Sequence, residues 1–329
     1  MILPGFEHGA GVHCGSTAML DALRFAGVTL SEPMIFGLGS GCSFTIHPGN
    51  QDLQPPQPTL LFAGRSMKFE EEVCSAALLK ATVAKPAGAA AVWQAAKALL
   101  DEGRPALVTT DLFHLPYLGA RGHWGGHLVV LVGHEPGFGW VADNERLGLE
   151  RVAEADLLLA LEGRAEPAAG LSVVRALQPR TLLTKVDLLP AAEAAIGRQA
   201  RLMLSESDSG EGRPVLERFP VELAALADRP DWQKCLRLGF QIIELRGNGG
   251  GLFRRLYGRF LTEVSRLGLS KAGELRAPTL AAADAWTALA QAMETARHRD
   301  RPELAEVVRL AEACVEAERA LWTRAAALF

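Results

Sequence analysis

Gly11-Val12-His13-Cys14-Gly15-Ser16-Thr17 is the stretch that decides the fold, because it sets a cysteine directly before an apolar segment, residues 18–27, that ends in glycine. The apolar residues of that segment recur at helical spacing and predict a short helix. A cysteine in the first turn of a helix faces unpaired backbone N–H groups and the positive end of the helix dipole, and both favour the thiolate. Cys14 is therefore the candidate nucleophile, and the alternative is a buried structural cysteine.

A nucleophilic cysteine needs a general base, and the base needs an orienting group. His127 opens an apolar run that is typical of a buried strand, and a glycine-containing turn and a second short strand follow it. In an antiparallel hairpin the start of the first strand lies beside the end of the second. We therefore predict that His127 lies next to Asp143, with Asn144 as the alternative orienting residue and His134 as the weaker candidate base. The chain order Cys, His, Asp or Asn is that of papain-like enzymes.

Three more residues are candidates for the same site. His8 lies six positions before Cys14, the offset at which papain-like folds carry a side-chain donor to the oxyanion. We expect His8 and the backbone N–H of Cys14 to form an oxyanion hole, which would stabilise a tetrahedral intermediate. His13, next to the nucleophile, is placed to tune its pKa or to contact substrate. Asp111 ends an expected strand at residues 106–110 and is a substrate-binding candidate, the alternative being a turn residue.

The first half of the chain contains four distinctive blocks, which are His8-Gly9-Ala10-Gly11-Val12-His13-Cys14-Gly15-Ser16-Thr17, residues 30–41, residues 103–111 followed by Leu115-Pro116-Tyr117, and the His127 hairpin. In this order they resemble the N-terminal domain of the butirosin biosynthesis protein H family. Residues 246–257 are similar to the domain of unknown function that accompanies this domain in many bacterial proteins.

The resemblance implies an acyltransferase with a cysteine-protease-like fold, in which Cys14, His127 and Asp143 would carry the chemistry. The family's named member moves an acyl group from an acyl carrier protein thioester onto an amine of an aminoglycoside. For this chain the expected partners are thus an acyl or peptidyl carrier protein and an amine-bearing small molecule, in specialised-metabolite biosynthesis. Tyr117 and Asn144 are further substrate-binding candidates. A hydrolase with the same triad, a peptidase, amidase or thioesterase, remains the alternative.

A run of glycines at residues 247–251 separates two expected helices. Glycine permits a helix end and a tight turn there, which is the simpler interpretation. The alternative is a backbone nest for a carboxylate or phosphate. On that interpretation Arg254 and Arg255 would bind substrate, namely the phosphopantetheine arm or an acidic helix of the carrier.

Composition narrows the class of protein. The chain has 329 residues, a net charge of −4 and 49% hydrophobic residues, which fits a globular protein and argues against a nucleic-acid binder. Five scattered cysteines without C-x-x-C spacing indicate a reducing compartment and no structural zinc site. With no signal peptide or membrane span visible, we expect a cytoplasmic protein. We expect no metal and no cofactor beyond the donor's phosphopantetheine, and the sequence is compatible with a homodimer.

The predicted fold class is α+β. Residues 1–165 should form a papain/C39-like catalytic domain, residues 166–180 a linker with a strand (171–174) that returns to it, and residues 181–329 a helical domain. Residues 34–44 are rich in glycine but lack the Gly-Lys-Ser/Thr ending of a phosphate loop, so we expect a loop or short strand that lines the cleft. The final helix should begin near a capping box formed by Asp300 and Glu303.

Overall fold

The computed structural model describes residues 1–329 except 77–78, 169–172, 180–184 and 208. The chain divides into two units, each built from three segments. The first unit holds residues 1–35, 49–57 and 77–183, and the second holds residues 36–48, 58–76 and 184–329. The predicted division at residues 165–181 differs, because residues 36–48 and 58–76 pack with the helices of the second unit.

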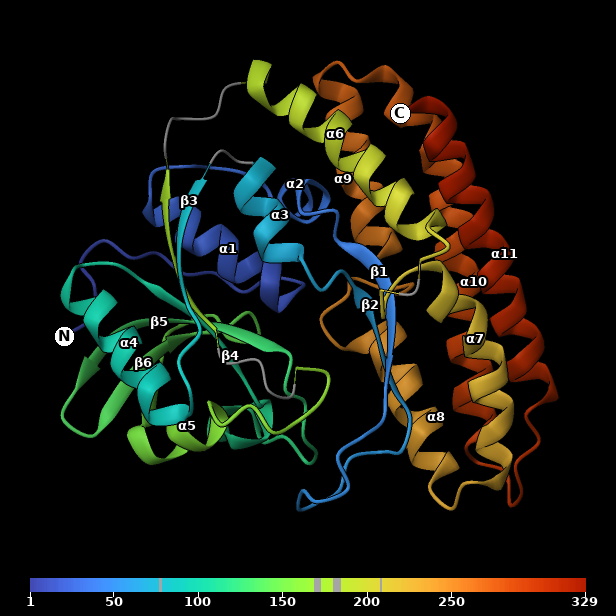
Figure 1. The fold of residues 1–329 in the computed structure, drawn as a ribbon, viewed down its shortest axis with the longest axis horizontal. Coiled ribbons are helices and arrows are strands. Elements are labelled where there is room, and N and C mark those ends of the chain that lie inside the picture. The colour runs from blue at the N-terminus through green and yellow to red at the C-terminus, as the bar shows by residue number, and fades with distance from the viewer. Residues whose placement is uncertain (77–78, 169–172, 180–184, 208) are drawn as a thin grey trace. The chain divides into compact units, whose positions relative to one another are not determined.

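An antiparallel sheet of six strands organises the first unit, in the order β3-β8-β4-β5-β6-β7 (Figure 1). The strands are β3 (Leu79–Ala84), β4 (Ala106–Thr110), β5 (His127–Glu135), β6 (Phe138–Ala142), β7 (Glu150–Ala153) and β8 (Val174–Pro179). Strand β8 pairs with both β3 and β4, so the chain returns to this sheet before its last segment, residues 184–329, joins the second unit. Of the strand expected at residues 171–174, residues 171–172 lie outside the described residues, and Val174 is the first residue of β8.

The predicted hairpin is formed by β5 and β6, which pair antiparallel from Val130↔Ala142 to Glu135↔Phe138. All residues of β5 from His127 to Gly133 are buried, as the apolar run requires. Helix α1 (Cys14–Phe25) packs against β5, while α4 (Ala89–Asp101) and α5 (Glu154–Ala160) share one core cluster with the sheet. Two short 3-10 helices, η1 (Leu112–His114) and η2 (Pro116–Leu118), follow β4.

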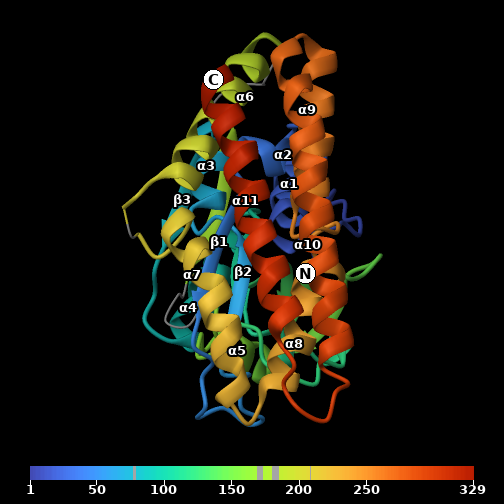
Figure 2. The ribbon, with the colours of Figure 1, turned by 90° about the vertical axis from the view of Figure 1, so that its right-hand side faces the viewer.

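Helices dominate the second unit, and its two strands, β1 (Cys42–His47) and β2 (Leu61–Arg65), form a separate antiparallel pair. Helices α10 and α11 run side by side, and α6, α7, α8 and α9 pack against them (Figure 2). The elements are α3 (Phe69–Ala76), α6 (Lys185–Leu204), α7 (Arg213–Ala224), η3 (Ala225–Asp228), α8 (Trp232–Phe240), η4, a π-helix (Gln241–Leu245), α9 (Arg254–Leu267), η5 (Ser270–Leu275), α10 (Arg276–Ala296) and α11 (Ala305–Leu328).

The glycine-rich segment at residues 34–44 ends in a strand, one of the two expected possibilities, because it contains the start of β1. Its first residues belong to the end of α2 (Glu32–Leu38) and not to a loop that lines a cleft. A Cβ atom on Gly37 would lie 2.0 Å from the ring of Phe260, and one on Gly41 would lie 2.6 Å from the ring of Phe36. Glycine is thus needed here for close packing within the second unit, and the residue spacing alone does not reveal that.

Two further expectations need correction. Helix α11 begins at Ala305 with Leu304 as its N-cap and without a side-chain cap, so Asp300 and Glu303 form no capping box. The sequence pattern also does not predict helices α2, α3, α5 and α7. Among the residues that the structure describes, no helix combines the length and apolar character needed to cross a membrane.

Candidate active site

Cys14 is the first residue of α1, as the sequence predicts. His13 is the N-cap, and its ring accepts a hydrogen bond from the backbone N–H of Ser16. The Sγ atom of Cys14 is only partly exposed and lies 4.0 Å from the carbonyl oxygen of Gly126. Within the described part of the chain, the backbone N–H of Cys14 has no hydrogen-bond acceptor, which leaves it available to an oxyanion.

His127 is the first residue of β5, and Asp143 directly follows β6, so the hairpin brings the two side chains together. The Nε2 atom of His127 lies 2.7 Å from Oδ2 of Asp143, and both side chains are buried. The other ring nitrogen is left for Cys14, whose side chain interacts with His127 strongly enough to shift the pKa values of both groups. Asp143, and not Asn144, therefore orients the base.

The electrostatics favour an ion pair between Cys14 and His127. Burial alone would raise the pKa of the Cys14 thiol, but the side chains of His127 and His13 hold it well below its ordinary value. Burial alone would lower the pKa of His127, but Asp143 and Cys14 raise it to about 10. At neutral pH the expected form is thus a thiolate beside an imidazolium, the reactive form of a cysteine nucleophile.

Glu32, at the start of α2, is a residue that the sequence analysis missed. Its carboxylate accepts hydrogen bonds from the backbone N–H groups of Val12 and His13, at 2.8 to 3.1 Å. It also accepts from the hydroxyls of Ser16 and Thr17, at 2.8 and 3.2 Å. One carboxylate therefore anchors both the loop before Cys14 and the first turn of α1. No local motif marks it, because its donors lie 15 to 20 positions earlier in the chain.

Tyr117 was predicted to bind substrate, but its hydroxyl donates a 2.7 Å hydrogen bond to Oδ2 of Asp143. Burial and the charge of Asp143 raise the pKa of Tyr117, so the phenol stays protonated and remains a donor. The guanidinium of Arg146 lies over its ring, 5.6 Å from the centroid. Tyr117 therefore supports the residue that orients the base.

His8 does not supply the predicted oxyanion donor, because both of its ring nitrogens are engaged elsewhere. Nδ1 lies 2.6 Å from Oδ2 of Asp21, and Nε2 donates to the carbonyl oxygens of Asp143 and Arg146 at 3.1 and 3.0 Å. Burial alone would lower the pKa of His8, but Asp21 and these carbonyls raise it. His8 thus ties the Asp143 turn to α1.

The remaining candidates of the first unit are also placed by the structure. Asn144 is buried, and its carbonyl oxygen accepts the backbone N–H of Gly11 at 3.2 Å, which links the Asp143 turn to the loop before Cys14. Asp111 is buried and caps η1 by accepting the N–H of Phe113. Its other carboxylate oxygen lies 2.6 Å from Nδ1 of His123. Asp111 is therefore an internal residue and does not face substrate.

In the second unit the predicted anion nest is filled by the chain itself. Oδ1 of Asn248 accepts the N–H of Gly250 at 2.6 Å, and Oε1 of Glu244 accepts the N–H of Gly251 at 3.2 Å. Arg254 is fully buried against Glu318 and cannot contact a carrier protein. Arg255 is paired with Asp284 at 3.0 Å. The simpler interpretation of this segment, a helix end and a turn, describes it correctly.

A group able to hold a metal ion occurs in the first unit, formed by Asp111, His114 and His123, whose ligand atoms lie within 4.8 Å of one another. Oδ2 of Asp111 and Nδ1 of His123 lie 2.6 Å apart, which is the distance of a hydrogen bond. The predicted nucleophile, base and orienting residue lie outside this group.

Comparisons with known proteins give two family matches. Residues 13–144 are similar to the family described as butirosin biosynthesis protein H, N-terminal, and residues 167–325 to a domain of unknown function, DUF4872. No curated protein shows significant similarity to the chain. A crystal structure of a candidate C39-like peptidase from Bacillus anthracis covers 53% of this chain and 96% of its own, with 12% identity and a TM-score of 0.35. The family match and the site together indicate a cysteine-protease-like enzyme.

Proposed function

We propose, from the premise that this chain joins a butirosin biosynthesis protein H N-terminal domain to DUF4872, that it is a cysteine-dependent N-acyltransferase. Its donor would be an acyl thioester of a carrier protein, and its acceptor an amine on a small molecule. The observation that carries the proposal is the array formed by the partly exposed Cys14 at the N-terminus of α1 and the buried His127 and Asp143.

In the first step the Cys14 thiolate attacks the thioester carbonyl carbon and forms a C–S bond. The charge that develops on the carbonyl oxygen is stabilised by the backbone N–H of Cys14. The intermediate then collapses and breaks the bond to the donor's sulfur, which leaves as a thiol after taking the proton of the His127 imidazolium. The products are acyl-Cys14, a free phosphopantetheine thiol and neutral His127.

In the second step the amine attacks acyl-Cys14, and neutral His127 accepts the amine's proton as the C–N bond forms. The C–S bond breaks, and Cys14 departs as a thiolate beside the His127 imidazolium. The starting state is thus restored and an amide is released. Exchange of a thioester for an amide is downhill, so the reaction requires no nucleotide.

Intact-protein mass spectrometry tests this proposal. The enzyme is mixed with acyl N-acetylcysteamine thioesters and with acylated carrier proteins, and the Cys14→Ala variant is treated in parallel. We expect the parent chain to gain the mass of the acyl group and the variant to gain none. Cys235→Ala is the matched control, because Cys235 is buried among residues of the second unit and should leave acylation unchanged.

The fate of the acyl group separates the two possible activities. Loss of the group only when an amine is added, with appearance of the amide, supports transfer. Loss at the same rate in water alone would instead establish a hydrolase with the same triad. If no donor acylates the parent chain although Cys14 reacts with iodoacetamide, the acyltransferase proposal is wrong.

A further inference from the structure

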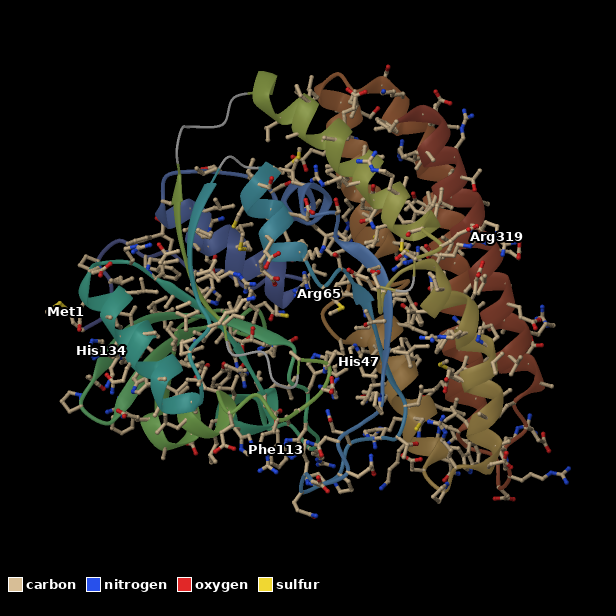
Figure 3. The ribbon with its side chains drawn as sticks, in the orientation of Figure 1. Met1, His47, Arg65, Phe113, His134 and Arg319 are labelled. Atoms are coloured by element: carbon tan, nitrogen blue, oxygen red, sulfur yellow. The ribbon has the colours of Figure 1, made fainter. Side chains whose placement is uncertain are left out.

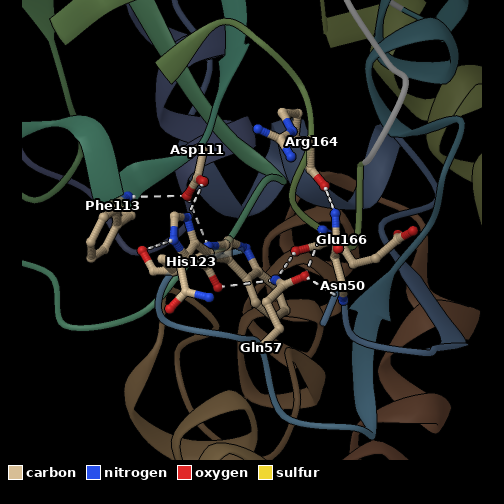
Figure 4. A network of polar contacts seen from close by, with 9 residues as sticks. Asn50, Gln57, Asp111, Phe113, His123, Arg164 and Glu166 are labelled. Carbon is tan, nitrogen blue, oxygen red and sulfur yellow. Dashed lines mark hydrogen bonds and ion pairs between the residues drawn. The ribbon is translucent and has the colours of Figure 1, made fainter. Parts of the chain in front are cut away.

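A second group of buried polar residues lies next to the catalytic hairpin, and the mechanism above does not use it (Figure 4). It begins where β4 ends. Thr110 pairs with His127 in the sheet, and its hydroxyl donates to the carbonyl of His127 at 3.0 Å. The next residue, Asp111, accepts the backbone N–H of Trp124 through Oδ1 at 3.0 Å and contacts His123 through Oδ2.

The segment that leads into His127 is held from a second side by Gln57. Its amide nitrogen donates to the carbonyl of His123 at 3.2 Å and to the carbonyl of Glu166 at 3.0 Å. The carbonyl of Glu166 also accepts the N–H of Gly125 at 3.0 Å. Figure 4 shows Asp111, His123 and Gln57 in one continuous chain of contacts. Residues 123, 124 and 125 are therefore each fixed by at least one hydrogen bond.

The fixed segment ends at the reacting groups. Gly126 places its carbonyl oxygen 4.0 Å from Sγ of Cys14, and the following residue is the base. A Cβ atom on Gly125 would lie 1.9 Å from the carbonyl oxygen of Ala165, so the backbone has little room to shift. A displacement of this segment would move both the Gly126 carbonyl and the His127 ring relative to Cys14.

We infer that Asp111 and His123, together with Gln57, are positioning residues that hold His127 in register with Cys14. This inference rests on the proposed function, because it assigns them a role in the same reaction. His123 is held at both ring nitrogens, because Nδ1 lies 2.6 Å from Oδ2 of Asp111 and Nε2 lies 3.1 Å from the carbonyl oxygen of Gln54.

A metal ion held by Asp111, His114 and His123 is the competing interpretation of the same cluster. Nitrogen and oxygen ligands of a tetrahedral zinc ion, at bond lengths of about 2.0–2.1 Å, stand roughly 3.3 Å apart. Nδ1 of His123 and Oδ2 of Asp111 are separated by only 2.6 Å, which leaves no room for an ion between them. The distances therefore favour the hydrogen-bonded pair.

Two substitutions of Asp111 separate these interpretations. Asp111→Ala removes all three carboxylate contacts, which are those with the N–H groups of Phe113 and Trp124 and that with His123. Asp111→Asn keeps an oxygen for the two N–H groups and presents an amide N–H to His123, so it keeps the hydrogen bonds without the carboxylate charge and is a poor metal ligand. The matched control is Asp101→Ala, which breaks an exposed Asp–His pair of similar geometry, at 2.7 Å from His134. Figure 3 shows that His134 lies in a different part of the first unit from Phe113, whose backbone N–H donates to Asp111.

The main readout is the rate of Cys14 alkylation by iodoacetamide as a function of pH, measured on folded protein and accompanied by acyl-transfer rates and zinc content. In the parent chain we expect fast alkylation even at pH values well below the ordinary pKa of a thiol. Asp111→Ala should shift this profile toward that of a simple thiol and slow transfer about 10- to 100-fold. Asp111→Asn should stay within about threefold of the parent. Asp101→Ala should match the parent.

Gln57→Ala removes the hydrogen bonds that hold the same segment from the other side, and it provides a second variant if Asp111→Ala does not fold. It should shift the profile in the same direction. Unchanged profiles in folded Asp111→Ala or Gln57→Ala would overturn the inference. So would equal defects in the Ala and Asn variants with loss of bound zinc, which would establish a metal site. An ordinary thiol profile in the parent chain would overturn the proposed function itself, before any variant is compared.

Discussion

Asp143 accepts three hydrogen bonds, and only one of them comes from the base. His127 and Tyr117 share Oδ2, while Oδ1 takes the backbone N–H of Glu145 at 3.0 Å. Burial alone would raise the pKa of Asp143, but these donors lower it, so the carboxylate stays charged. A carboxylate held at both oxygens can fix the orientation of an imidazole ring, and that orientation directs the other ring nitrogen to Cys14.

At this scale Tyr117→Phe is the informative substitution. It removes one donor to a charged carboxylate, a bond of about 1.5–3 kcal/mol, and leaves the ring packing intact. Because the hydroxyl contacts Asp143 and not substrate, we expect kcat for acyl transfer to fall about tenfold or more with the KM of the donor unchanged. Steady-state kinetics with a single thioester measures both parameters.

Tyr257→Phe is the matched control for this prediction. Its hydroxyl is buried in the second unit and has no hydrogen-bond partner among the described residues, so its removal should leave transfer unchanged. A rise in KM with unchanged kcat in Tyr117→Phe would instead restore the original interpretation of Tyr117 as a substrate contact.

The helix α1 supplies the nucleophile, but its N-terminus is held in place by a residue of another element. The loop directly before α1 contains Gly9 and Gly11, and Gly15 is the second residue of the helix, so this segment is costly to order. Glu32, on α2, offsets that cost by accepting from two backbone N–H groups and two hydroxyls. Among the residues that the structure describes, none accepts a hydrogen bond from the backbone N–H of Cys14.

Glu32→Gln tests the role of this anchor. An amide nitrogen cannot accept from the donors that surround the carboxylate, so part of the set is left unpaired. We expect a loss of about 1–3 kcal/mol in the free energy of unfolding and a decrease in the Cys14 alkylation rate at neutral pH. Urea denaturation and peptide mass spectrometry after iodoacetamide treatment measure these quantities.

The control for Glu32→Gln is Glu7→Gln, an exposed glutamate on the same N-terminal segment, which should change neither quantity. If Glu32→Gln unfolds at the same urea concentration as the parent and keeps the parent's alkylation rate, Glu32 is not an anchor.

On the scale of the whole molecule, the chain passes between its two units several times. The first unit has a buried apolar core, and the second unit also has a buried polar centre. In the second unit that centre is the ion pair between Arg254 and Glu318, at 2.6 Å and almost without exposure. The indole N–H groups of Trp286 and Trp322 donate to the same carboxylate, at 2.7 and 2.6 Å. Three helices, α9, α10 and α11, thus meet at one glutamate.

Glu318→Leu should destabilise the protein strongly, because it leaves the Arg254 charge buried without its partner. We expect a loss of about 3–5 kcal/mol in the free energy of unfolding. The control is Glu316→Gln on the same helix, whose exposed pair with Arg319 should contribute at most about 1 kcal/mol. Chemical denaturation of both variants checks this, and equal small losses would show that the buried pair is dispensable.

The sequence by itself determined the features that depend on neighbouring residues. Helical spacing after Cys14 places the cysteine at the N-terminus of α1, and alternating apolar and turn segments define the β5–β6 hairpin. Since hairpin geometry relates the two ends of a short segment, the contact between His127 and Asp143 also follows from local pattern. The mixed first half, the helical second half and the family resemblance were all accessible in this way.

Only the tertiary structure decided which side chains support these residues and which are buried. Glu32, Tyr117 and His8 act on positions far from them in sequence, and Arg254 looks like a surface arginine until α11 covers it. The physical reason is that a polar side chain's role depends on which donor or acceptor it meets after folding. Sequence spacing limits that choice only within an element or a hairpin, and contacts between distant segments are selected by packing.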